Sequence, residues 1–116
     1  MESLEIVKKA VKAMEDKKAY NISVIDISKI SVIGDYFIIS EGSNRNQIQA
    51  ISDNVSEELA KEKVFAKQTE GYANANWILL DYGDVIMHIF DPESHNFYDL
   101  ERIWRDGEQI PLESLK

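Results

Sequence analysis

The sequence WILLDYGDVIMHIF, residues 77–90, contains two apolar runs on either side of a polar stretch centred on Gly83. Both runs are short and rich in branched and aromatic side chains, which is typical of β-strands. Aspartate and glycine favour the tight turn that joins two antiparallel strands. The stretch therefore predicts a β-hairpin with strands at Trp77–Asp81 and Val85–Phe90.

The turn leaves two strand registers open. If Tyr82-Gly83 is the whole turn, His88 lies opposite Trp77 on the same face of the sheet. If Asp84 also belongs to the turn, the pairing shifts by one residue and His88 moves to the other face. The first register groups His88 with Trp77, Leu79 and Ile86, and the second groups it with Ile78 and Leu80.

Two upstream segments have apolar residues at spacings of three and four, which predicts amphipathic helices. The first helix spans Ser3–Lys18, and the second starts after Asn44 and ends near Glu62 or Lys63. Asn44 is a favourable N-cap, and Gln47 stands where a capping box places its second residue. The apolar stripes are Leu4, Val7, Val11 and Met14, and then Ile48, Ile51, Val55 and Leu59.

Three more strands are predicted, at Tyr20–Ile27, Tyr36–Ile39 and Val64–Gly71. Tyr36–Ile39 is a continuous apolar run, so we expect it to be buried on both faces. A strand followed by a helix and another strand implies a parallel pairing, whereas the hairpin implies antiparallel ones. The predicted fold class is therefore α/β, with a mixed five-stranded sheet and flanking helices.

Beyond the hairpin, Asp91 followed by Pro92 is a helix-start signal. Phe97, Leu100 and Trp104 then repeat at spacings of three and four. We expect one domain over residues 1–106 and a loosely held tail over residues 107–116.

The composition limits the classes of partner. The net charge of −8 argues against direct recognition of nucleic acid. It leaves open an attraction to a basic protein, although the charge by itself is explained more simply by solubility. The sequence contains no cysteine, which excludes disulfides and thiolate sites. It has no signal-peptide pattern and no apolar run near the ~20 residues that cross a bilayer. We expect a cytoplasmic protein without membrane contact.

Three groups of residues could carry chemistry, and each also has a simpler structural interpretation. Gly42-Ser43 could hold a phosphate or simply precede a capped helix. Asp81 and Asp84 could bind a divalent ion or stabilise the turn. His88 and His95 could bind a metal, but a single histidine on a strand is more often a hydrogen-bonded packing residue. We favour the structural interpretations and expect no catalytic residue, metal or cofactor.

The aromatic side chains are the strongest functional signal. Trp77, Tyr98 and Trp104 have the large, rigid surfaces that are enriched at interface hot spots. They belong either to the core or to a protein-binding surface.

The chain also resembles a known family. The resemblance rests on residues 35–39, Gly42-Ser43, Glu70-Gly71, residues 77–84 and 88–90, and residues 97–104. In order and spacing these motifs are similar to those of the ribosomal silencing factor family, also called the Iojap family, over nearly the whole chain.

The resemblance implies a fold similar to that of nucleotidyltransferases and a factor that binds the large ribosomal subunit. It implies docking on large-subunit ribosomal protein fourteen, which blocks association with the small subunit and slows translation when nutrients are short. The aspartate pair that follows the Gly-Ser turn in nucleotidyltransferases is missing, because residues 44–47 read NRNQ. We therefore expect a binding protein and not an enzyme.

The predicted partner-binding residues are Trp77, Leu79, Asp81, His88, Tyr98, Asp99 and Glu101. Two alternatives stay open. The first is a vestigial or active nucleotidyltransferase-like enzyme that uses Asp81 and Asp84 with magnesium. The second is a homodimer whose aromatic face pairs with itself, which need not exclude docking on the ribosome.

Overall fold

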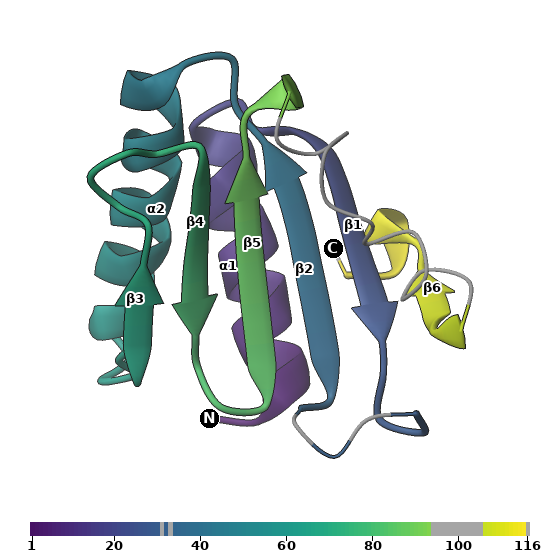
Figure 1. Ribbon diagram of the computed structural model, residues 1–116. Helices are drawn as coiled ribbons and strands as arrows, with labels where there is room; N and C mark the ends of the chain where they lie inside the picture. The colour runs from purple at the N-terminus through teal and green to yellow at the C-terminus, as the bar shows by residue number, and fades with distance from the viewer. Residues whose placement is uncertain (31, 33, 94–105, 116) are drawn as a thin grey trace.

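A computed structural model describes residues 1–30, 32, 34–93 and 106–115. Six strands form one mixed sheet in the order β3-β4-β5-β2-β1-β6, and two helices cover one of its faces (Figure 1). The helices are α1 (Ser3–Asp16) and α2 (Arg45–Ala60). The strands are β1 (Tyr20–Asp26), β2 (Tyr36–Glu41), β3 (Gln68–Glu70), β4 (Trp77–Asp81), β5 (Val85–Phe90) and β6 (Glu108–Ile110).

The two helices bury the stripes that their sequences predict. The four stripe residues of α2 are fully buried, and three of the four in α1 are buried, whereas Leu4 is 39% exposed. The start of α2 is capped as expected, because the Gln47 backbone N–H donates to the Asn44 side chain over 2.9 Å. Local periodicity therefore determines both helices, and a side-chain cap supports the start of α2.

The centre of the sheet is the parallel pair of β2 and β5, in register from Tyr36↔Val85 to Glu41↔Phe90. From Phe37 onward β2 is buried, in agreement with a strand that is covered on both faces. The chain leaves β2 through α2, forms β3 and β4 at one edge of the sheet, and returns as β5. Mixed pairing is thus confirmed.

The five-strand count is wrong, because a sixth strand comes from residues that we expected to be a loose tail. β6 pairs antiparallel with β1, from Val24↔Ile110 to Asp26↔Glu108. The 3₁₀ helix η1 (Leu112–Leu115) follows, and Leu115 is only 7% exposed within the core. The predicted strand Val64–Gly71 is also shorter, since only β3 pairs, and it pairs with β4.

Side chains on the two faces of the sheet form separate clusters. The face under α1 and α2 contributes Val24, Ile38, Ile78, Leu80, Val85, Met87 and Ile89 to the main core. The opposite face contributes Ile25, Ile27, Phe37, Ile39 and Phe90, with Trp77 and Ile86 packed against them. The apolar residues of the hairpin are therefore divided between the core under the helices and the other side of the sheet.

Candidate protein-binding surface

The turn between β4 and β5 is formed by Gly83 and Asp84. The Tyr82 backbone N–H donates to the Val85 carbonyl over 3.0 Å, which closes a two-residue turn. Gly83 has a φ of +88°, and a turn with a positive φ at its first central position favours glycine there. Asp81 stabilises the turn, because its side-chain Oδ1 accepts the Gly83 N–H over 2.8 Å.

This turn sets a register that differs from both predicted ones. Leu79 lies opposite His88, and Trp77 lies opposite Phe90, so the predicted Trp77–His88 pair is wrong. The observed register is two residues away from the first predicted one. Because side chains alternate with a period of two, such a shift leaves every side chain on its original face. The predicted grouping of His88 with Trp77, Leu79 and Ile86 is therefore correct.

Four aromatic rings meet on this face of the sheet. The Trp77 indole N–H donates to Nδ1 of His88 over 2.9 Å. The Trp77 and His88 rings stack with centroids 5.7 Å apart, and Phe90 stacks on Trp77 at 5.4 Å. Phe37 meets the His88 ring edge-on at 5.0 Å. These contacts hold the inner edge of the Trp77 indole against the sheet.

His88 was predicted as a contact residue, but its side chain is only 4% exposed. Burial lowers the pKa of His88 from 6.5 to about 4, because charging the imidazole in an apolar environment is unfavourable. The ring is therefore neutral near pH 7. This agrees with the simpler interpretation of a hydrogen-bonded packing residue, and it leaves His88 no exposed surface to offer a partner.

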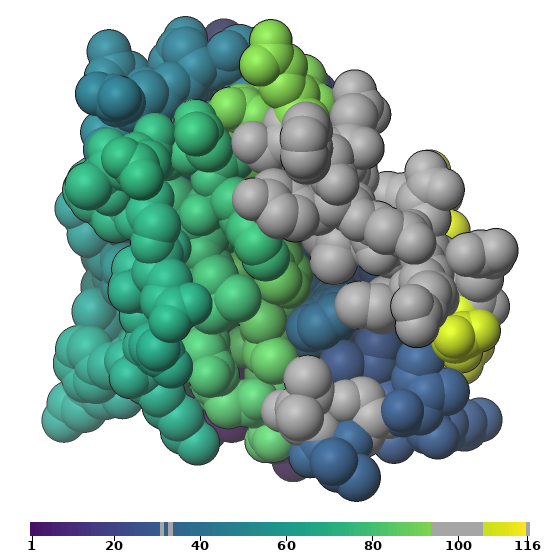
Figure 2. All heavy atoms as spheres, viewed as in Figure 1, coloured from purple at the N-terminus to yellow at the C-terminus, as the bar shows by residue number. Residues whose placement is uncertain are grey.

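An exposed part of this face lies over β3 and β4. Trp77, Leu79 and Asp81 are half-buried, and the β3 residues Gln68 and Glu70 beside them are exposed. The register pairs Glu70 with Leu79 and Gln68 with Asp81, which puts both β3 side chains on the same face. We call these five residues the β4 surface. Figure 2 views the molecule from this side, with β3 and β4 in green.

Glu70 is a candidate that the sequence reasoning missed as a site residue. In the sequence Glu70 belongs to a predicted strand and to the Glu70-Gly71 motif of the family resemblance. Neither shows its neighbours on the surface, which depend on the β3–β4 register. The other predicted contacts, Tyr98, Asp99 and Glu101, lie outside the described residues. The predicted helix that contains Phe97, Leu100 and Trp104 lies outside them as well.

The two carboxylates proposed for magnesium have different partners. Asp81 binds the Gly83 amide of the turn, whereas the Asp84 side chain accepts a hydrogen bond from the Ser3 hydroxyl over 3.5 Å. Within residues 1–30, 32, 34–93 and 106–115, no group of three His, Asp or Glu residues is arranged to hold a metal ion. The geometry supports the turn interpretation of Asp81.

The Gly42-Ser43 turn uses its own amides. The Gly42 N–H donates to the Phe90 carbonyl over 3.0 Å, and the Ser43 N–H donates to Gln47 Oε1 over 2.6 Å. The Gln47 amide nitrogen in turn donates to the carbonyls of Lys17 and Lys18. Backbone groups that would otherwise cradle a phosphate are thus bonded within the protein, which supports the interpretation as a capped helix start.

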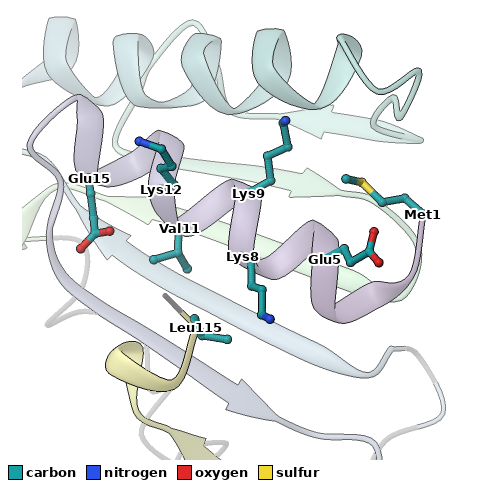
Figure 3. A pocket seen from close by; sticks show the side chains of 8 residues that line it. All are labelled: Met1, Glu5, Lys8, Lys9, Val11, Lys12, Glu15 and Leu115. Carbon is teal, nitrogen blue, oxygen red and sulfur yellow. The ribbon is translucent and has the colours of Figure 1, made fainter.

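A groove of ≈ 610 Å³ runs along α1 beside η1 (Figure 3). Val11 and Leu115 give it an apolar floor, and side chains of both charges, including Lys8 and Glu15, line its sides. It lies on the helix side of the sheet, away from the β4 surface. Its lining has no arrangement of groups that favours a particular ligand.

Comparison with known proteins identifies the family. A family model described as "Ribosomal silencing factor during starvation" matches residues 1–116. The chain belongs to the ribosomal silencing factor family. The resemblance that the sequence motifs predict is therefore confirmed.

Individual members of the family are similar over nearly the whole of this chain. The ribosomal silencing factor of Bacillus subtilis is 36% identical, covering 99% of this chain and 95% of that protein. The chloroplastic Iojap protein of Arabidopsis thaliana is 37% identical over 96% of this chain but only 46% of its own length. A crystal structure from Chromobacterium violaceum matches with a TM-score of 0.87 and 33% identity, covering 96% of this chain and 91% of that one.

Family members carry the names of silencing factors, which are regulators rather than enzymes. Among the described residues, no helix is both long and apolar enough to cross a membrane.

Proposed function

We propose that this protein binds the large ribosomal subunit by docking on large-subunit ribosomal protein fourteen. Docking there sterically blocks association with the small subunit and represses translation, especially under nutrient limitation. The observation that carries the proposal is the β4 surface, in a chain that belongs to the ribosomal silencing factor family. On this surface Trp77 and Leu79 are half-buried, and the carboxylates of Asp81 and Glu70 lie on the same face.

The chemistry of the β4 surface suits a basic protein partner. A half-buried tryptophan whose ring is already held by its neighbours can bury a large area with little loss of side-chain freedom. Carboxylates beside it attract lysine and arginine side chains, and the net charge of −8 adds a long-range attraction. Tyr98, Asp99 and Glu101 remain proposed contacts.

A steric mechanism requires no reaction. Asp81 and the Gly42-Ser43 amides are engaged in local hydrogen bonds, which disfavours the alternative of a magnesium-dependent nucleotidyltransferase. We infer a fold related to that of nucleotidyltransferases but without their function. We further propose that the protein is cytoplasmic. A homodimer formed through the β4 surface would dissociate when that surface docks on the ribosomal partner.

The proposal is tested by co-sedimentation with purified large ribosomal subunits and by a subunit-joining assay. Trp77→Ala should weaken binding by about 2 kcal/mol, roughly thirtyfold, and relieve the block on joining. Leu4→Ala is the matched control, because Leu4 is a 39% exposed apolar residue on α1, at the other face of the sheet. The proposal fails if folded Trp77→Ala binds like the parent, or if the parent does not sediment with large subunits.

A further inference from the structure

The hydrogen bond between Trp77 and His88 connects an exposed ring to a buried one. The indole Nε1–H donates to His88 Nδ1 over 2.9 Å, and the two rings lie 28° from parallel. Trp77 is half-buried, whereas His88 is 4% exposed and enclosed by the rings of Phe37 and Phe90. His88 therefore contacts the proposed docking residue from below, out of reach of a partner.

The direction of this bond fixes the protonation of the imidazole. Nδ1 accepts a hydrogen, so it carries the lone pair, and the ring proton of the neutral imidazole is on Nε2. Among the described residues, Nε2 is buried and has no hydrogen-bond partner. A buried donor without a partner lowers stability, so an aliphatic side chain would pack here at less cost.

An aliphatic side chain cannot accept the indole proton. The feature that histidine adds at this position is thus an acceptor placed beneath Trp77. We propose that His88 is a positioning residue for docking, which holds the Trp77 indole in one orientation without itself touching the partner. The inference rests on the proposed function, in which Trp77 is a contact residue.

The physical basis is preorganisation. A half-exposed tryptophan without an anchor samples several rotamers and loses that freedom on binding. In this protein the Trp77 indole N–H is bonded to Nδ1 of His88, and its ring stacks on Phe90 with centroids 5.4 Å apart. The side chain has therefore lost this rotamer freedom before the partner binds. The partner then meets a fixed aromatic surface.

The test uses two substitutions that separate positioning from stability. His88→Leu removes the acceptor but also removes the unpaired donor, so the fold should be as stable as the parent or more so. Its affinity for purified large subunits should nevertheless fall about tenfold, the equivalent of one lost hydrogen bond. His88→Asn keeps an acceptor near the position of Nδ1, and it should be less stable yet bind better than His88→Leu.

If His88 had a purely structural role, affinity for large subunits would rise and fall with the stability of the parent, His88→Leu and His88→Asn. That result would overturn the inference. Trp77→Phe supplies a second check, because it retains an aromatic ring but has no N–H. In that background His88→Leu should cause no further loss of affinity. A further loss of similar size would show that His88 acts independently of the indole, and would also overturn the inference.

A readout without the ribosome separates this inference from the proposed function. Exchange of the Trp77 indole N–H with solvent, followed by NMR and assigned with Trp77→Phe, should be faster in His88→Leu than in the parent. If the parent fails to bind large subunits, the proposed function fails, and the role in docking fails with it. If the parent binds and Trp77→Phe binds more weakly, while His88→Leu binds like the parent, only the inference about His88 fails.

Discussion

Leu79 of β4 lies directly opposite His88 of β5. This pairing puts both residues, together with Trp77, on the sheet face that the helices leave uncovered, while Ile78 and Leu80 enter the core beneath α1 and α2. Over β3 and β4 this uncovered face keeps exposed and half-buried side chains. The pairing therefore divides the hairpin into a structural side and a candidate binding side.

The burial of His88 predicts a stability that depends on pH. Its pKa is lowered from 6.5 to about 4 in the folded protein, so between these values the unfolded chain binds a proton that the folded one does not. The contribution of neutral, buried His88 to the free energy of unfolding is thus fully present above about pH 6.5 and is lost as the pH falls toward 4. Between about pH 7 and about pH 5 this group alone should lower the free energy of unfolding by about 2 kcal/mol.

The measurement is urea unfolding of the parent and of His88→Leu at both pH values. The difference between the two proteins isolates the histidine from the carboxylates, which also titrate in this range. Equal pH dependence in the two would contradict the assignment of a buried, neutral His88.

Two glycines with positive φ should differ in their tolerance of alanine. A Cβ on Gly71 would lie 2.1 Å from the Trp77 carbonyl oxygen, whereas a Cβ on Gly83 would meet the flexible end of Lys67 at 3.0 Å. Gly83→Ala should cost about 1–2 kcal/mol from its backbone conformation alone. Gly71→Ala adds a backbone collision, so its cost should be about 3 kcal/mol or more. Thermal unfolding of both variants checks the order, which would be contradicted by equal losses.

Substitutions of Asp81 should separate its hydrogen bond from its charge. Asp81→Asn keeps an oxygen that can accept the Gly83 N–H, so stability should change little, while Asp81→Ala should lose about 1 kcal/mol. Both variants remove a carboxylate from the β4 surface. We expect both to bind large subunits more weakly at low salt, with less dependence on ionic strength than the parent. An unchanged salt dependence would exclude Asp81 from the interface.

The C-terminal residues should contribute to stability. Leu115 is 7% exposed in the core, so Leu115→Ala should lower the free energy of unfolding by about 2 kcal/mol. Glu113→Ala is the control, because this exposed residue of η1 should change it by less than about 0.5 kcal/mol. Equal, small effects in chemical denaturation would mean that the tail is loosely held after all.

The parts of the fold that were predicted correctly depend on neighbours in sequence. Ile48, Ile51 and Val55 define the buried side of α2 through a period of three and four, and Asn44 caps that helix within one turn. β6 has three residues, too few for a period to emerge, and it forms because β1 offers it a free edge. To predict β6, one would have to know the order of the strands in the sheet.

The candidate site divides in the same way. The sequence identified Trp77, Leu79 and Asp81 from residue type and strand alternation. It did not identify Glu70, which reaches the β4 surface through the β3–β4 pairing, and it could not show that His88 lies below Trp77. These relationships join residues that are distant along the chain or whose register is set by a turn.

By itself the sequence determined the two helices, five of the six strands, the acidic balance and the family, because each depends on local pattern or on ordered motifs. The tertiary structure alone decided the register at Gly83, the addition of β6, and the burial of His88. The reason is physical: a period of two allows either face for a strand, and only packing against other strands and helices selects which side chains are buried.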